Sequence, residues 1–290
     1  MGILNVTPDS FSEGGQFFDR KAAIARGLEI GGEGADILDI GGESTRPGAL
    51  PISTEEELDR TIPVIEALKK KGLRIPISID TYKARVAERA LQAGAEIVND
   101  VSGLRYDASL AAVVQQHRAG IVLMHLRGAP RTMQGLPPVR DIVSAVRRGL
   151  AASFRRALWA GIRKRQIVLD PGIGFGKTAA QNFEMINGLR RFASLGYPIL
   201  VGPSRKSFIR AALVPSEVEG TVSERKLVRT ATARERAPLG KRNFHSVSEE
   251  LLFGTAAAVT ASILNGAHIV RVHDVRAMLS VVRVAERLLA

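Results

Sequence analysis

Short aliphatic runs alternate with longer amphipathic segments along almost the whole chain. Each aliphatic run ends at or next to a polar side chain, as Ile75–Ile79 does before Asp80. Each amphipathic segment repeats its apolar residues every three or four positions, which is typical of an α-helix with one buried face. Short buried strands that alternate with helices of this kind indicate parallel strand pairing with right-handed crossovers.

The aliphatic runs predict eight strands and the amphipathic segments predict eight helices. Thr54 is predicted as the N-cap of the second helix, with Glu57 completing a capping box. The predicted strands are Gly2–Asn5, Ile37–Ile40, Ile75–Ile79, Ile97–Val98, Ile121–Met124, Ile167–Leu169, Pro198–Val201 and His268–Val272. The predicted helices are Lys21–Gly32, Glu55–Lys71, Lys83–Ala93, Ser109–Arg118, Asp141–Ile162, Gln181–Leu195, Glu249–Leu264 and Val275–Leu289.

Eight strand–helix units in a chain of 290 residues predict a single-domain α/β protein with a (β/α)8 TIM barrel spanning residues 1–290. A doubly wound open sheet is the alternative. The first predicted strand–helix turn lacks the Gly-x-Gly-x-x-Gly fingerprint of that fold. Polar residues also follow nearly every strand, whereas an open sheet would gather them at one switch point, so the barrel is favoured.

One stretch, Val214–Ser246, breaks the alternation just before the seventh barrel helix. We expect a basic, flexible insertion, since a loop of this length in a compact domain is functional or disordered. It is either a solvated insertion without chemistry or a basic lid over an anionic ligand. Residues Arg225–Arg242 contain seven Lys or Arg and one Glu, which accounts for +6 of the net charge of +12. Because the excess is local and no recognition motif accompanies it, we expect no nucleic-acid partner.

Composition narrows the setting in which the protein works. The chain has no cysteine, which excludes disulfides and a cysteine nucleophile and fits a reducing compartment. No uninterrupted apolar stretch reaches the length of a membrane span, and the first residues do not resemble a signal peptide. We therefore expect a cytoplasmic protein with no membrane partner.

Polar residues at the strand ends are the candidate chemical groups, because strand carboxyl ends all face one side of a (β/α)8 barrel. Taken singly, each has an ordinary explanation: Asp80 and Asp170 could cap the following helices, Asn99 could form an Asx turn, and His273 could be a partly buried histidine. Together, the carboxylates, amides and cations suggest a polar heterocycle beside an anion. The set is Asn5, Thr45, Arg46, Asp80, Asn99, Asp170, Lys206, Arg271 and His273.

These residue types suggest a ligand with two parts, a flat ring and a phosphate. Carboxylates accept from the N–H edge of a flat ring, an asparagine both donates and accepts, and a guanidinium stacks on the ring. The turns Gly202–Ser207 and Arg271–His273 are rich in donors and suit phosphate. The segment Asp170–Lys177 is neither a P-loop nor a dinucleotide fingerprint, because Pro171 and Lys177 stand where those motifs need glycine. Its glycines are instead expected to let a ring approach closely.

Seven blocks in order along the chain resemble the dihydropteroate synthase family, a family of pterin-binding enzymes. The resemblance covers nearly everything except Val214–Ser246. The blocks are Met1–Ser12, Gly41–Gly48, Ile79–Thr81, Val98–Gly103, Asp170–Lys177, Ser204–Ser207 and Arg271–Asp274.

The resemblance implies a (β/α)8 transferase of folate biosynthesis, usually a homodimer. It implies that 6-hydroxymethyl-7,8-dihydropterin diphosphate condenses with 4-aminobenzoate to give 7,8-dihydropteroate and diphosphate, by a dissociative substitution. It also implies a Mg²⁺ held by one side chain and the phosphates, and loops Thr7–Gly15 and Glu43–Leu50 that close over the site. The loop Glu43–Pro51 has no extra residues of the kind seen in sulfonamide-insensitive relatives, so we expect a sulfonamide target.

Residue roles are implied in the same way. Asp80, Asp170, Lys206 and Arg271 are expected to be catalytic. The pterin edge is expected at Asp80, Asn99, Asp170 and Lys206, with Met124 and Phe175 near it, and with Arg271 stacked on the ring. Gly202 is expected among the substrate-binding residues. The diphosphate is expected at Arg271, His273 and Asn5, with Asn5 as the metal ligand. The aminobenzoate side is expected at Thr45, Arg46, Pro47, Phe175, Ser204 and Lys206.

Two other functions remain open from the sequence alone. A corrinoid-linked methyltetrahydrofolate methyltransferase shares a pterin-binding barrel, but it should lack the Ser204–Ser207 block. An inactive pterin-binding protein would keep the fold without turnover. The intact Asp80, Asp170, Lys206 and Arg271 argue against that reading.

Overall fold

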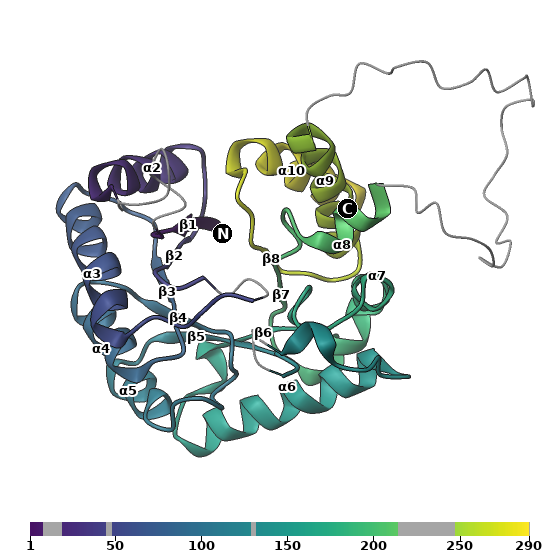
Figure 1. Cartoon of the computed structure of the whole chain (residues 1–290), viewed down its shortest axis with the longest axis horizontal. Coiled ribbons are helices and arrows are strands. Elements are labelled where there is room, and N and C mark those ends of the chain that lie inside the picture. The colour runs from purple at the N-terminus through teal and green to yellow at the C-terminus, as the bar shows by residue number, and fades with distance from the viewer. Residues whose placement is uncertain (8–18, 45–47, 129–131, 214–246, 290) are drawn as a thin grey trace, which may run out of the picture.

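The computed structural model describes residues 1–7, 19–44, 48–128, 132–213 and 247–289, and within them strands and helices alternate (Figure 1). The strands are β1 (Gly2–Asn5), β2 (Leu38–Gly41), β3 (Ile77–Asp80), β4 (Ile97–Asp100), β5 (Gly120–Met124), β6 (Ile167–Asp170), β7 (Leu200–Val201) and β8 (Ile269–Val270). The helices are α2 (Arg20–Gly32), α3 (Thr54–Lys70), α4 (Ala84–Gln92), α5 (Leu110–His117), α6 (Ile142–Trp159), α7 (Ala179–Asn187), α8 (Ser207–Leu213), α9 (Val247–Leu264) and α10 (Val275–Leu289).

The strands close into a ring, which confirms the predicted barrel. Strands β1 to β6 pair in sequence order in one parallel sheet, and β7 pairs with β8. Leu169 N donates to Pro198 O at 2.9 Å and connects β6 to the β7 segment. At the other seam Ile3 N donates to Val272 O at 3.0 Å, which connects β8 back to β1. The helices surround the strands, as Figure 1 shows.

The register brings polar residues together at one end of the barrel. Asn5 lies opposite Gly41, Gly41 lies opposite Asp80, and Asp80 lies opposite Asn99. Met124 lies opposite Asp170 in the same way. The polar residues expected to follow β3, β4 and β6 are therefore within those strands, at their carboxyl ends, where the ladder fixes their relative positions.

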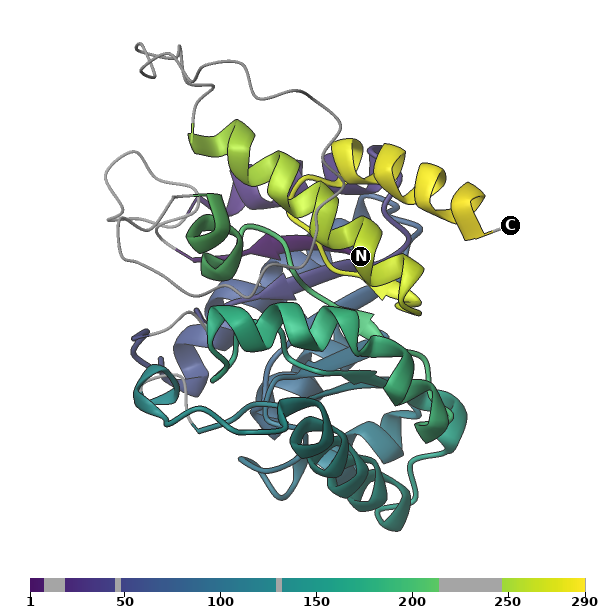
Figure 2. The same cartoon turned by 90° about the vertical axis from the view of Figure 1, so that its right-hand side faces the viewer.

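The interior of the barrel is apolar at the opposite end. Met1, Val122 and Leu200 form a buried layer there, and Ile97 and Val168 pack against it. Residues of this layer, among them Met1, Val122 and Leu200, line a mainly apolar pocket. A second, larger core lies between the outer face of the strands and the helices, which are seen from the side in Figure 2.

Several helices differ from the prediction: α6 ends at Trp159 instead of Ile162, and the short helix α8 (Ser207–Leu213) was not predicted. Ser53, not Thr54, is the N-cap of α3, and its Oγ accepts from Glu56 N at 3.1 Å. The predicted helix Gln181–Leu195 is α7 followed by a 3-10 segment, Leu189–Leu195, because Gly188 ends α7. Strands and helices still alternate along the chain, so the barrel is unaffected.

Some calls fall outside the described residues. The insertion Val214–Ser246 belongs to the chain between α8 and α9, and residues 214–246 are not described. The predicted domain boundaries therefore stay a prediction. No helix within the described ranges is both long and apolar enough to cross a membrane.

Candidate active site

Arg271 lies between two carboxylates at the polar end of the barrel. Its Nε donates to Asp39 Oδ2 at 2.6 Å, and its Nη2 donates to Asp80 Oδ2 at 2.7 Å. Burial alone would lower the pKa of Arg271, but the charges of Asp39 and Asp80 outweigh burial and raise it. The guanidinium is therefore charged and has a fixed orientation before any ligand enters.

Asp39 connects this guanidinium to the amide of Asn99. Asn99 Nδ2 donates to Asp39 Oδ2 at 3.1 Å, and the Asp39 side chain is fully buried. Sequence reasoning missed Asp39, because it treated only the residues at strand ends as candidates. The signal was present, since a carboxylate inside the aliphatic run Ile37–Ile40 needs a buried partner.

Asp170 and Lys206 form a second charged group across the barrel end. Asp170 Oδ1 accepts from Gly172 N at 2.7 Å, and burial raises the pKa of Asp170 while the charge of Lys206 opposes that shift. Burial lowers the pKa of Lys206 to about 8, with Asp170 acting in the opposite direction. The Lys206 ammonium donates to Ile173 O and lies 4.5 Å from the centre of the Phe175 ring.

Phe175 also contacts an apolar cluster at the end of β5 and in the segments that follow β4 and β5. Val101, Met124, Leu126 and Met133 form this cluster, and Phe175 packs against it. The structure thus brings Met124 and Phe175 together, as expected for two walls of one ring site. The apolar cluster and Phe175 lie next to the charged Asp170 and Lys206, a combination that suits a flat ring with a polar edge.

Two of the glycines after Asp170 pack closely against the backbone that follows β5. Gly172 and Gly176 have positive φ, and a Cβ would lie 2.1 Å from His125 O at the first and 2.3 Å from Arg127 O at the second. These two glycines let the loop pack against the segment after β5; close approach of a ring to the loop stays a prediction. Lys177, which is buried, holds the loop by donating to Gly172 O at 2.7 Å and to Phe175 O at 3.0 Å.

Ser204 and His273 meet where β7 and β8 end. Ser204 Oγ lies 3.0 Å from His273 Nδ1, and His273 N donates to Ser204 Oγ at 3.2 Å. Gly202 leaves space beside Arg271, because a Cβ there would lie 3.7 Å from Arg271 Cβ. The two turns predicted to bind the anion, Gly202–Ser207 and Arg271–His273, therefore lie next to each other at the ends of β7 and β8.

The remaining predicted residues are placed in part. Asn5 is half-buried at the carboxyl end of β1, on the strand that pairs with β2. Thr45, Arg46 and Pro47 lie outside the described residues, as does most of the predicted closing loop Thr7–Gly15. In the described part of the chain, no three His, Cys, Asp or Glu side chains gather in a way that could hold a metal.

Comparisons with known proteins point to one family. The sequence profile of the family described as "Pterin binding enzyme" matches residues 1–273. A dihydropteroate synthase of Synechocystis is 46% identical over 288 residues, which cover 99% of this chain and 89% of that protein. One from Bacillus subtilis is 42% identical and covers 100% of this chain and 88% of that protein.

Solved structures agree with the sequence relatives. The dihydropteroate synthase of Xanthomonas albilineans, solved with 4-aminobenzoic acid, matches with a TM-score of 0.82 and 40% identity, over 100% of this chain and 92% of that one. A complex of the X. albilineans enzyme with 7,8-dihydropteroate matches with a TM-score of 0.79 and 37% identity, over 100% and 93%.

Proposed function

The chain belongs to the pterin-binding enzyme family, as a transferase of the dihydropteroate synthase type in folate biosynthesis, and on that premise we propose which side chains act in the reaction. The substrates are 6-hydroxymethyl-7,8-dihydropterin diphosphate and 4-aminobenzoate. The bond from the pterin methylene carbon to the diphosphate oxygen breaks, a bond from that carbon to the arylamine nitrogen forms, and the amine loses a proton.

Asp80 and Asp170 are proposed to stabilise the positive charge that develops on the pterin. Departure of diphosphate from a carbon next to an electron-rich ring gives a dissociative, cation-like transition state. Burial raises the pKa of both carboxyls, which means that their charged forms are poorly solvated. A cation that forms beside them is stabilised more strongly in this site than in water.

Arg271 and His273 are proposed to face the diphosphate, and Asn99 and Lys206 the pterin edge. Arg271 donates from Nε to Asp39 and from Nη2 to Asp80. A guanidinium has further N–H groups that can donate to a ligand. Lys206 lies over Phe175 and beside Asp170, where an ammonium can donate to a ring carbonyl or nitrogen. In this arrangement Asn99 and Lys206 face the polar edge of the pterin, and Arg271 and His273 face the diphosphate.

Magnesium is proposed at Asn5. Its amide oxygen is a hard donor of the kind Mg²⁺ prefers, and Asn5 is partly exposed at the strand end, where a ligand can reach it. With no cluster of acidic side chains in the described residues, the substrate's phosphate oxygens and water must complete the coordination. Bound there, Mg²⁺ would neutralise charge on the leaving diphosphate.

One observation supports the proposal most directly: the β3, β4 and β6 ends and Arg271 bring Asp80, Asn99 and Asp170 to one barrel end in a chain 46% identical to a dihydropteroate synthase. The test is release of diphosphate by the purified protein with each substrate alone and with both together. We expect release only with both. Pterin binding without release would indicate an inactive pterin-binding protein, and release independent of 4-aminobenzoate would refute the synthase reaction.

A homodimer in the cytoplasm is proposed with this function, on the family resemblance. Light scattering of the purified chain tests the first part, and we expect twice the mass of one chain.

A further inference from the structure

Lys177 is a buried lysine that the proposed reaction does not use. Its ammonium donates to Gly172 O at 2.7 Å, to Phe175 O at 3.0 Å and to His125 O at 3.3 Å, and it lies 3.4 Å from His125 Nδ1. Only 7% of the residue is exposed. Because backbone atoms of two segments enclose the ammonium, we assign it no direct contact with either substrate.

Two of these carbonyls belong to residues that hold or form the proposed pterin site. Gly172 N donates to Asp170 Oδ1 at 2.7 Å, so the residue whose carbonyl Lys177 holds also orients the Asp170 carboxylate. The side chain of Phe175 packs against the cluster that contains Met124. One ammonium thus fixes the residue that orients Asp170 and the residue that supplies an aromatic wall.

The third carbonyl joins the loop to a neighbouring strand end. His125 directly follows β5, and its backbone N donates to Asp170 O at 2.8 Å. A Cβ at Gly172 would lie 2.1 Å from His125 O, so the loop and the segment after β5 meet through backbone atoms. Lys177 donates to carbonyls on both segments and therefore fixes the loop after β6 relative to the end of β5.

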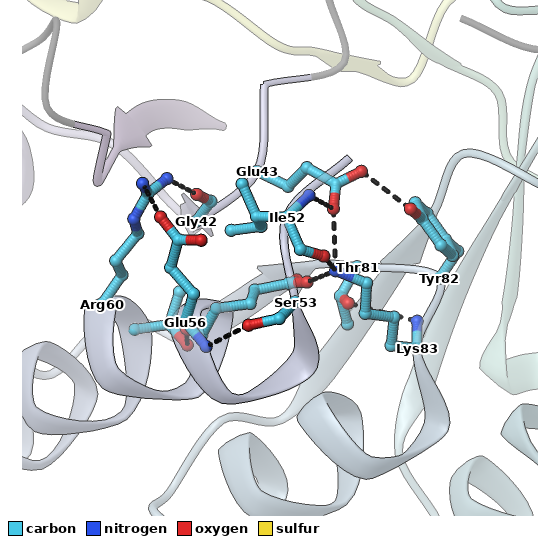
Figure 3. A network of polar contacts seen from close by, with 11 residues as sticks. Gly42, Glu43, Ile52, Ser53, Glu56, Arg60, Thr81, Tyr82 and Lys83 are labelled. Carbon is cyan, nitrogen blue, oxygen red and sulfur yellow. Dashed lines mark hydrogen bonds and ion pairs between the residues drawn. The ribbon is translucent and has the colours of Figure 1, made fainter. Parts of the chain in front are cut away.

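A second buried lysine, Lys83, holds its charge in a different way (Figure 3). Its ammonium lies 2.7 Å from Glu43 Oε2 and 2.7 Å from Glu57 Oε2. Burial alone would lower the pKa of Lys83, but hydrogen bonds to these two carboxylates outweigh burial and raise it. Lys83 is therefore a buried cation whose charge is compensated by direct ion pairs.

The contacts of Lys177, in contrast, are with neutral groups. They are three carbonyls and the imidazole of His125, whose pKa burial lowers to about 3. Burial lowers the pKa of Lys177 to about 7, while the charge of Asp170 acts in the opposite direction. A buried ammonium held by neutral acceptors opposes folding, and groups perturbed in this way gather at functional sites. The arrangement favours a positioning role over a stabilising one.

We propose that Lys177 is a positioning residue of the pterin site, where it holds Gly172 and Phe175 so that Asp170 and the aromatic wall can bind the ring. This role rests on the proposed function, which places Asp170 at the pterin edge. Because Lys177 acts through these residues, its replacement should weaken pterin binding although no group that touches the ring is removed.

The test measures the dissociation constant of 6-hydroxymethyl-7,8-dihydropterin diphosphate with Mg²⁺ by calorimetry, without 4-aminobenzoate. Lys177→Met removes the donors, Lys177→Gln keeps a neutral donor, and Asp170→Asn is measured alone and together with Lys177→Met. Lys69→Met is the matched control, since the Lys69 ammonium pairs with Glu96 Oε1 at 2.8 Å just before β4, away from the strand carboxyl ends.

Circular dichroism gives the folded fraction of each variant at the temperature of the calorimetry. Unfolding alone raises an apparent dissociation constant only by the inverse of the folded fraction. A rise beyond that factor reports a change in the site itself, which a merely structural lysine would not cause. The two measurements together therefore separate positioning from stability.

We expect Lys177→Met to stay folded and to raise the dissociation constant roughly tenfold, about the effect of impairing one charge-assisted hydrogen bond. Lys177→Gln should show a smaller rise, and Lys69→Met should match the parent protein. Because Lys177 acts in part through Asp170, the double variant should lose less affinity than the product of the two single effects.

Three results would overturn the positioning role: an unchanged dissociation constant in Lys177→Met, a rise that its folded fraction explains, or a double variant that equals the product of the single effects. If Lys177→Met does not fold, Lys177→Gln decides by the same criteria, because it keeps a donor for the carbonyls. A parent protein that binds the pterin diphosphate but releases no diphosphate with both substrates would refute the proposed reaction, and that result is distinct from a failure of the positioning role.

Discussion

Replacing Asp39 by alanine removes the carboxylate that two buried donors share. Arg271 Nε loses an acceptor at 2.6 Å and Asn99 Nδ2 loses one at 3.1 Å. The Asp39 side chain is 0% exposed and that of Arg271 is 20% exposed, so water cannot fully replace the lost contacts. Ser78, the strand neighbour of Asp39, offers a matched control because its buried Oγ makes no hydrogen bond within the protein.

The expected magnitude follows from the contacts. Removing one partner of a buried ion pair costs about 3–5 kcal/mol. Asp80 remains as a second carboxylate for Arg271, so we expect the lower end of that range, about 3 kcal/mol of unfolding free energy. For a chain of this size the thermal midpoint should fall by roughly 6 °C. Asp39→Asn keeps the volume and one acceptor and should lose about half as much.

Urea unfolding followed by far-ultraviolet circular dichroism measures these differences. The single tryptophan, Trp159, is 93% exposed and is a poor fluorescence reporter of unfolding. Ser78→Ala should be neutral or slightly stabilising, because it removes a buried hydroxyl that has no protein partner. A loss below about 1 kcal/mol for Asp39→Ala, or an equal loss for Ser78→Ala, would refute the reasoning, since either would mean that the shared acceptor does not matter.

Four further results are expected. Asp170→Asn should weaken pterin binding in calorimetry, and unchanged affinity would remove Asp170 from the ring site. Because the pKa of Lys206 is about 8, KM for the pterin diphosphate should rise above that pH as the ammonium loses its proton, and Lys206→Arg should flatten the profile. Burial lowers the pKa of Lys177 from the usual lysine value of 10.5 to about 7, so between these two pH values the folded chain binds fewer protons than the unfolded chain. The free energy of unfolding should therefore increase with pH over this range, by at most about 1.4 kcal/mol per pH unit. Lys177→Met should remove this contribution to the slope. Growth of a folate-synthesis-deficient strain rescued by this chain should stop at high sulfonamide, and persistent growth would contradict the expected sensitivity.

Hydrophobic periodicity was sufficient for the fold, because each strand and helix is short and its buried face is aliphatic. Ile77–Asp80 and Ile97–Asp100 begin and end within two residues of the predicted strands. The N-cap of α3 was missed for a local reason: Ser53 and Thr54 both favour that position, and only the backbone selects Ser53. The helix after β6 is interrupted at Gly188. The hydrophobic pattern alone does not show that this glycine ends the helix.

The candidate site was predictable only where strand ends define it. Asp80, Asn99 and Asp170 could be selected because barrel topology places strand ends together. Asp39 and Lys177 could not be selected in that way. Asp39 lies inside β2, and Lys177 ends the glycine-rich loop after β6, so their roles depend on which donors and acceptors the register and the loop packing bring within reach.

The polar barrel end is unfavourable for the charges it already holds, and this is what suits it to the reaction. Burial raises the pKa of Asp80 and Asp170 and lowers that of Lys206, so each charged form lacks solvation in the free enzyme. A ring that gains positive charge as diphosphate leaves compensates the two carboxylates at the moment of bond breaking. The neutral ground state gives less compensation, so the interaction is stronger in the transition state, which is the condition for raising kcat rather than only lowering KM. The same dry surroundings explain why Arg271 pairs with both Asp39 and Asp80, since a buried guanidinium needs carboxylates that compensate its charge.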